Sequence, residues 1–139
     1  MTSAGLELQK ALLAVLKADK TVEKLVGGRI YDRVPEKADF PYVTLGSSSI
    51  YDWSTATERG GEHLFTLHVW DRAGGRTTVF RIMDAIDRLL FEPELALADH
   101  RLVNLDLQYS QARAEDNRDG YLGILRYRAV TEETDVVSP

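Results

Sequence analysis

The sequence predicts an α+β domain in which a mostly antiparallel sheet of about five strands is covered by two longer helices. Two segments, near residues 3–18 and 77–91, carry apolar residues at helical spacing. Three others, near residues 63–71, 101–109 and 121–131, are rich in strand-forming residues and alternate in part. Because one helix separates the first two of these strands and loops join the others, a sheet with helices on one face is expected.

Size and composition favour one domain with its own core. The chain has 139 residues, of which 44% are hydrophobic and 28% are charged. No repeat, linker or shift in composition divides residues 1–139. We therefore predict a single domain over the whole chain.

The N-terminal part is predicted to form two helices. The first covers Ser3 to Ala18, and its apolar face consists of Leu8, Ala11, Leu12, Val15 and Leu16. A short helix is expected to follow, with Thr21 as its N-cap and Glu23 in its first turn, where a carboxylate suits the helix dipole. Gly27 is expected to end it.

Two strands are predicted next, from Arg29 to Asp32 and from Tyr42 to Ser49. Pro35 and Pro41 each fix their own φ and disfavour helix in the preceding residue, so the segment between the strands is expected to be extended. The first strand is short and lies near a proline, which is typical of a sheet edge.

The segment from 49 to 63 has no consistent periodicity, and we interpret it as a long loop or a hairpin. The strand from His63 to Asp71 follows, with apolar residues on both faces, so it is predicted to be central in the sheet. One face carries Phe65, Leu67 and Val69, and the other carries Leu64, Thr66, His68 and Trp70.

The second long helix is predicted from Thr77 to Phe91, closed by Pro93. Its apolar face is formed by Val79, Ile82, Met83, Ile86, Leu89 and Leu90. Its solvent side is predicted to carry Arg81, Asp84, Asp87 and Arg88.

The last two strands are predicted to form a hairpin. The first, Arg101 to Tyr109, is expected to be half-buried, with Val103, Leu105, Leu107 and Tyr109 on one face. A polar loop over residues 110–120 leads to the second strand, Tyr121 to Thr131. Residues 131–139 are predicted to form a flexible acidic tail.

The residues give no support for catalysis, a cofactor or a metal. The chain has no cysteine, which excludes thiolate nucleophiles and thiolate metal sites. His63 and His68 are five apart on a strand and point to opposite faces, and His100 is distant, so we expect surface or interface histidines. The serines of 46–49 lack a nucleophile elbow, and the glycine pair of 71–78 lacks the lysine of a phosphate-binding loop.

Charge and hydropathy exclude two further classes. The net charge of −5 is opposite in sign to that of a protein that grips phosphate backbones, so tight nucleic-acid binding is disfavoured. No stretch approaches the roughly 20 apolar residues that cross a bilayer, and no signal peptide is recognised, so no membrane association is expected.

A protein interface is the remaining candidate. Aromatic residues and charges of both signs on loops are typical of interfaces. The predicted interface residues are Tyr51, Trp53, Arg59, Arg113 and Arg118. The alternative is that Trp53 folds back onto the core.

Several segments of the chain resemble, in this order, the corresponding segments of one protein family. These are RIYDRVPEKADFPYVTLG, then Trp53, then HLFTLHVWDRAGG, VFRIMDAIDRLL and YLGILRYRA. Over about Leu8 to Ala129, the chain resembles the tail completion proteins of long-tailed bacteriophages and gene transfer agents, also described as tail terminators or tail-to-head joining proteins. The specificity lies in the order and spacing of the segments rather than in a single motif.

The resemblance implies a structural role in the virion, after assembly in the cytoplasm of a bacterial host, and no enzymatic activity. It implies a ring of six copies that caps the tail tube, ends its polymerisation and joins the tail to the head connector. The expected partners are further copies of the chain, the tail tube protein and the head-tail connector protein. DNA is expected to pass through the lumen without specific binding, and the family has no fixed catalytic residues or cofactor to carry over.

Two alternatives stay open at this point. A neighbouring head-tail connector or head completion ring protein would share the size and the assembly habit. A small α+β ligand-binding dimer is the other, although the sequence does not indicate a pocket with convergent polar groups.

Overall fold

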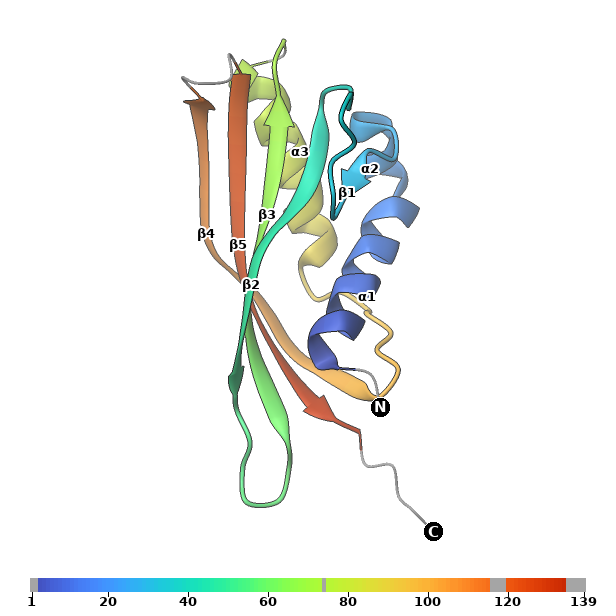
Figure 1. Ribbon diagram of the computed structural model, residues 1–139, viewed down its shortest axis with the longest axis vertical. Coiled ribbons are helices and arrows are strands. Elements are labelled where there is room, and N and C mark those ends of the chain that lie inside the picture. The colour runs from blue at the N-terminus through green and yellow to red at the C-terminus, as the bar shows by residue number, and fades with distance from the viewer. Residues whose placement is uncertain (1–2, 74, 116–119, 135–139) are drawn as a thin grey trace.

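The computed structural model describes residues 3–73, 75–115 and 120–134. In chain order its elements are α1 (Ala4–Ala18), α2 (Lys20–Val26), β1 (Ile30–Tyr31), β2 (Tyr42–Asp52), β3 (Gly60–Asp71), α3 (Gly75–Leu90), β4 (His100–Glu115) and β5 (Gly120–Glu133). The strands form one sheet in the order β1-β2-β3-β5-β4, and the helices lie on one side of it (Figure 1). The predicted α+β class, the order of the elements and the covered face are confirmed.

The pairing of the strands is antiparallel except at one edge. β2 pairs with β3, β3 with β5 and β5 with β4 in antiparallel register, whereas β1 pairs with β2 in parallel. β3 is therefore central, as predicted, and the two-residue β1 lies at a sheet edge, as predicted. β4 forms the opposite edge of the sheet as far as the chain is described.

The core lies between the sheet and the three helices. Leu67 of β3 is opposite Leu125 of β5, and both are buried. Phe65 and Tyr127 are also opposite one another, with ring centroids 5.5 Å apart. The helices cover this face with Leu8, Leu12, Leu16, Val22, Val26, Val79, Ile82, Met83 and Ile86. Burial of this apolar surface is the main driving force for folding.

The helix ends follow local capping chemistry, with one correction. Ser3 caps α1, and its side chain accepts a hydrogen bond from the backbone N–H of Leu6 at 3.2 Å. The N-cap of α2 is Asp19 rather than the predicted Thr21, because the Asp19 carboxylate accepts from the N–H of Val22 at 3.0 Å and the helix begins at Lys20. Gly27 ends α2 in the left-handed conformation at φ 59°, as predicted.

The segment from 49 to 63 is a hairpin rather than a loop. β2 continues to Asp52 and β3 begins at Gly60, so both strands are longer than predicted. The turn is closed by the N–H of Trp53, which donates to the carbonyl of Gly60 at 3.0 Å. The hairpin extends beyond the helices at one end of the molecule (Figure 1).

β4 departs from its prediction in length and in exposure. It runs to Glu115, so residues 110–115 of the predicted loop are strand. Two register shifts, between Leu102 and Asn104 and between Leu107 and Tyr109, break the predicted alternation. The strand is mostly exposed rather than half-buried, because it lies at the sheet edge and has a neighbour on one side only within the described chain.

The C-terminal segment begins later than predicted. Thr131 is fully buried and β5 continues to Glu133, so residues 131–133 belong to the sheet and not to a flexible tail. The N–H of Glu133 donates to the carbonyl of Arg59 at 2.9 Å, which fixes this end of β5 against the hairpin. The rest of the predicted tail, residues 135–139, lies outside the described residues.

One polar residue of α3 lies inward of its predicted position. Asp87 was expected on the solvent side, but it is half-buried and accepts a hydrogen bond from the hydroxyl of Tyr127 at 2.9 Å. Burial and the neighbouring Asp87 carboxylate raise the pKa of Tyr127 well above its usual range.

The hydrogen bond between Tyr127 and Asp87 can be tested by substitution. We expect Tyr127→Phe to lower the free energy of unfolding, measured by urea denaturation, by about 1 kcal/mol because this bond is lost. An unchanged value would show that the bond contributes nothing.

Candidate interaction surfaces

The hairpin between β2 and β3 brings three of the predicted interface residues to one end of the molecule. Tyr51 is 54% exposed and Trp53 is 51% exposed, while Arg59 lies exposed just before β3. The Trp53 ring lies against the guanidinium of Arg128, 5.1 Å from its ring centroid. The alternative that Trp53 folds onto the core is therefore wrong.

The other two predicted interface residues are elsewhere. Arg113 is exposed on β4, where its Nε donates to Glu115 at 2.8 Å. It pairs in register with Leu122 of β5, far along the sheet from the hairpin. Arg118 lies outside the described residues. The structure thus gathers Tyr51, Trp53 and Arg59 and does not bring Arg113 to them.

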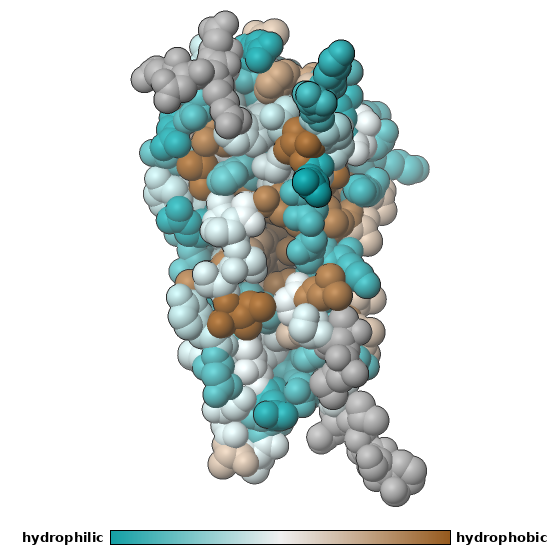
Figure 2. Space-filling view, viewed as in Figure 1, coloured by the Kyte–Doolittle hydropathy of each residue, from teal (hydrophilic) through white to brown (hydrophobic). Residues whose placement is uncertain are grey.

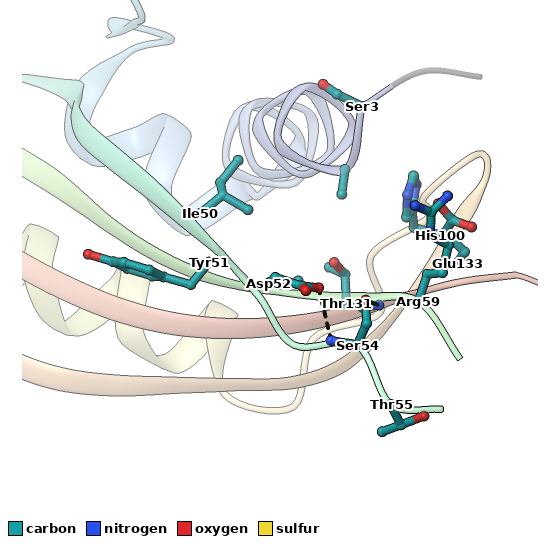
Figure 3. Close-up of a pocket in the computed structure, with 13 residues that line it drawn as sticks. Ser3, Ile50, Tyr51, Asp52, Ser54, Thr55, Arg59, His100, Thr131 and Glu133 are labelled. Carbon is teal, nitrogen blue, oxygen red and sulfur yellow. Dashed lines mark hydrogen bonds between the residues drawn. The ribbon is translucent and has the colours of Figure 1, made fainter. Parts of the chain in front are cut away.

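An open groove of about 730 Å³ lies between the hairpin and the start of α1 (Figure 3). Asp52 in this groove accepts from the N–H of Ser54 at 3.0 Å. Hydrogen bonds from the side chain of Ser54, and then from its backbone N–H, lower the pKa of the Asp52 carboxyl. Tyr51 points away from the other labelled residues in Figure 3. Among residues 3–73, 75–115 and 120–134, no group of three histidine, aspartate or glutamate side chains could hold a metal ion.

Behind this groove lies a buried polar pair that ties α1 to β4. His100 Nδ1 is 2.9 Å from Oε2 of Glu7, and the N–H of Asp99 donates to Oε1 of Glu7 at 2.8 Å. Both Glu7 and His100 are buried. These hydrogen bonds satisfy the buried Glu7 carboxylate and hold the start of β4 against α1.

His63 is buried as well, so the prediction of surface or interface histidines is wrong for His63 and His100. Its Nε2 lies 2.8 Å from the hydroxyl of Thr131. Its Nδ1 is buried with no hydrogen-bond partner in the part of the chain that is described. Burial, and then the nearby charge of His100, lowers the pKa of His63. Strand alternation places His63 on the same face as Phe65, Leu67 and Val69, so its burial could have been predicted from the sequence.

The lowered pKa gives a pH dependence of stability. The folded state holds His63 neutral, so the unfolded state binds more protons once the pH falls below about 6.5. We expect the free energy of unfolding to be full above that pH and to decline as the pH falls below about 6.5, with a smaller decline in His63→Asn. Urea denaturation across this range measures both slopes, and equal slopes would contradict the assignment.

The face of the sheet opposite the helices carries arginines that are mostly paired. Arg101 bonds to Glu132, and Arg128 bonds to Glu62 at 2.5 Å. Arg126 lies over the ring of Tyr109, 5.1 Å from its centroid. Figure 2 looks onto this side and shows a mostly hydrophilic surface with separate small hydrophobic patches. This face therefore presents balanced charge rather than a basic track.

A second groove, of about 560 Å³, lies between the C-terminal end of α3 and β4. Its apolar lining includes Phe91, Val103 and Leu107, which are 76%, 47% and 37% exposed. Val103 and Leu107 were predicted on one face of a half-buried strand and Phe91 at the end of a helix. That prediction did not recognise that β4 lies at a sheet edge. Exposed apolar side chains gathered in this way are typical of protein contact sites.

No described helix combines the length and the apolar character needed to cross a bilayer. The described surface offers two grooves, an exposed hairpin and a sheet edge. These are features through which proteins contact one another.

Comparison with known proteins agrees with this description. The family model of tail completion protein gp17 matches residues 10–132. A chain from the virion of a native gene transfer agent particle is 32% identical, with a TM-score of 0.87 over 95% of this chain and 99% of that one. The gp17 protein of bacteriophage SPP1 is 20% identical and shares the fold, with a TM-score of 0.58 over 98% of this chain and 94% of that one.

No curated protein matches the chain. The family match covers most of the sequence, and the similarity to the virion chain extends over nearly all of both proteins. The chain therefore belongs to the tail completion protein gp17 family and is a structural virion protein of a phage or gene transfer agent tail.

Proposed function

We propose that this chain assembles into a closed ring of six copies that caps the tail tube, ends its polymerisation and joins the tail to the head connector. The observation that carries the proposal is the family match over residues 10–132, together with the 32% identity to a chain of a gene transfer agent virion. A ring at the end of a tube explains how a small chain without a catalytic centre contributes to a particle.

The fold supports a ring built from head-to-tail contacts. Such a contact needs two different patches on each subunit, one for each neighbour. β4 forms one edge of the sheet. The other edge is formed by β1 and by the part of β2 that follows its short pairing with β1 at Val43 and Thr44. The two sides of the subunit therefore differ, which suits a closed ring better than a symmetric dimer.

We also propose that DNA passes through the ring without specific binding. The chain has a net charge of −5, and Arg101, Arg113 and Arg128 are each paired with a glutamate. A lumen of balanced or acidic charge lets a duplex slide, whereas unpaired arginines would hold phosphates. Binding of duplex DNA to the assembled ring that weakens steeply with salt would contradict this part of the proposal.

The hairpin end is proposed as the contact with the tail tube or the connector, through Tyr51, Trp53 and Arg59. The other two residues of the predicted interface, Arg113 and Arg118, are proposed for contacts elsewhere on the ring. Aromatic residues that are half-exposed can bury a large area against a partner at low entropic cost.

Trp53→Ala provides a test of the hairpin contact. The free energy of unfolding should fall by no more than about 1 kcal/mol, because Trp53 is half-exposed and loses one cation–π contact. The yield of joined heads and tails should fall at least about tenfold, the effect of losing an interface hot spot. Thr57→Ala in the same turn is the matched control, and equal joining by both variants would remove the hairpin from the contact.

Particles made without this chain test the function itself. We expect DNA-filled heads and separate tails, with tubes of uncontrolled length, when electron micrographs are compared with particles that contain it. An epitope label on the chain should lie at the head-proximal end of the tube. A label on the portal side of the connector would instead indicate a head completion protein, and normal joined particles without the chain would contradict both roles.

A further inference from the structure

One lateral side of the helical layer carries an acidic and apolar stripe on α3. Phe80, Asp84, Asp87 and Phe91 are spaced i, i+4, i+7 and i+11. The first three lie along one side of α3, and Phe91 directly follows its last residue, Leu90. Phe80 is 49% exposed and Phe91 is 76% exposed. Asp87 and Phe91 also line the groove beside β4, as does Glu92. The α3 stripe therefore faces the side of the subunit on which β4 forms the sheet edge.

The outer face of α1 carries a basic and apolar stripe, on the side away from the buried Leu8, Leu12 and Leu16. Leu6, Lys10, Leu13 and Lys17 have the same spacing of i, i+4, i+7 and i+11. Leu6 is 43% exposed, both lysines are exposed, and Leu13 is partly buried. The end of β4 near Glu115 lies across the sheet from α1 in Figure 1, whereas the start of β4 lies beside the first turns of α1, where Glu7 bonds to His100. Within one subunit α3 packs mainly on β3, β4, β5 and α2, and α1 packs mainly on α2 and β1, so the two stripes are not each other's main packing partners in the same chain.

We propose that the α1 stripe of one copy packs against the α3 stripe and the adjoining groove of the next copy. This inference rests on the proposed ring and assigns the contact that repeats around it. The lysines of the α1 stripe meet Asp84, Asp87 and Glu92, and Leu6 and Leu13 cover the exposed Phe91. Opposite charges on two faces that also carry apolar residues set the register of such a contact and exclude the reverse pairing.

The geometry makes this contact heterologous and repeatable. Each copy offers one α1 stripe and one α3 stripe, which are different patches, so each copy can have two neighbours. The proposed ring of six requires that the rotation between neighbours closes. The edge strand β4 lies on the same side as the α3 stripe. The same contact therefore covers the parts of Val103 and Leu107 that are exposed in the single subunit.

Charge reversal tests the pairing. We expect the double variant Lys10→Glu/Lys17→Glu to lose the ring, and Asp84→Lys/Glu92→Lys to lose it too, because like charges then meet at each contact. Light scattering should give the mass of a single chain for each. An equimolar mixture of the two variants should restore the ring with alternating copies, since opposite charges then meet at both kinds of contact.

The matched control is Lys20→Glu/Lys24→Glu on α2, which makes the same change in net charge away from the stripe. This control should assemble like the unchanged chain, and circular dichroism should show every variant folded. Rings formed by Lys10→Glu/Lys17→Glu alone, or loss of assembly in the α2 control to the same extent, would overturn the inference.

Cross-linking gives a second measurement that also works inside particles. Because the chain has no cysteine, Lys10→Cys/Asp84→Cys carries the only two thiols. A short bismaleimide should join neighbouring copies into a ladder on a denaturing gel, ending at the copy number of the ring. Each single cysteine variant should give no ladder.

The proposed ring and the proposed contact between its copies can be contradicted separately. An intact ring without a cross-linked ladder would overturn the assigned contact and leave the proposed function in place. A chain found as a single copy both in solution and in particles would overturn the ring and this contact together.

Discussion

Gly123→Val is expected to lower the free energy of unfolding by about 3 kcal/mol, because β5 packs closely beneath α3 at this position. A Cβ atom on Gly123 would lie 2.6 Å from Cγ1 of Val79 and 2.7 Å from Sδ of Met83. Both neighbours belong to the buried face of α3. The helix must move away from the sheet to admit a larger side chain, and urea denaturation measures the cost.

Gly61→Ala is the control for this substitution. A Cβ atom on Gly61 would meet its nearest neighbour, Nε2 of His63, at 3.4 Å, which is an ordinary contact. We expect its stability to change by less than about 1 kcal/mol, with a gain from the reduced freedom of the unfolded chain. If both variants were equally stable, the close packing of α3 on β5 would be contradicted.

Glu7→Ala is the second change with a large expected effect. It removes the acceptor of two hydrogen bonds, from the N–H of Asp99 at 2.8 Å and with Nδ1 of His100 at 2.9 Å. These bonds join α1 to the start of β4 across a buried site. We expect a loss of about 3 kcal/mol, since hydrogen bonds to a charged group in the interior contribute more than exposed ones.

Glu7→Gln separates the loss of hydrogen bonds from the loss of packing. Its amide oxygen can still accept from Asp99, so about half of the lost stability should return. Glu36→Ala, on the exposed crossing between β1 and β2, should change stability by less than about 0.5 kcal/mol. Equal stability of Glu7→Ala and Glu36→Ala would show that the buried pair contributes nothing.

Hydrophobic spacing predicted the elements and the covered face of the sheet, because it reports directly on burial. Leu67, Leu125 and Tyr127 all point to the helices, as their alternation indicated. Helix ends were predicted less well. Asp19 precedes Thr21 by two residues, and either side chain can cap a helix, so only the observed backbone identifies the cap.

The candidate contact surfaces were predicted only in part. Tyr51, Trp53 and Arg59 lie at the same end of the molecule because they belong to one hairpin, whose residues are near one another in the sequence. The groove beside β4 was missed, since the exposure of Val103 and Leu107 depends on a strand order that local pattern does not specify. The spacing of Phe80, Asp84 and Asp87, followed by Phe91, was present in the sequence and could have indicated an acidic and apolar stripe beside the buried face of α3.

The central claim is that copies of this chain form a ring at the end of a tail tube. The most direct test is the mass of the purified protein by light scattering, alone and with the tail tube protein added. The account predicts a mass of six chains of 15.6 kDa, or single chains that become a ring on the tube end and stop its growth. A stable dimer that does not bind the tube protein would contradict the account and would favour the small ligand-binding dimer instead.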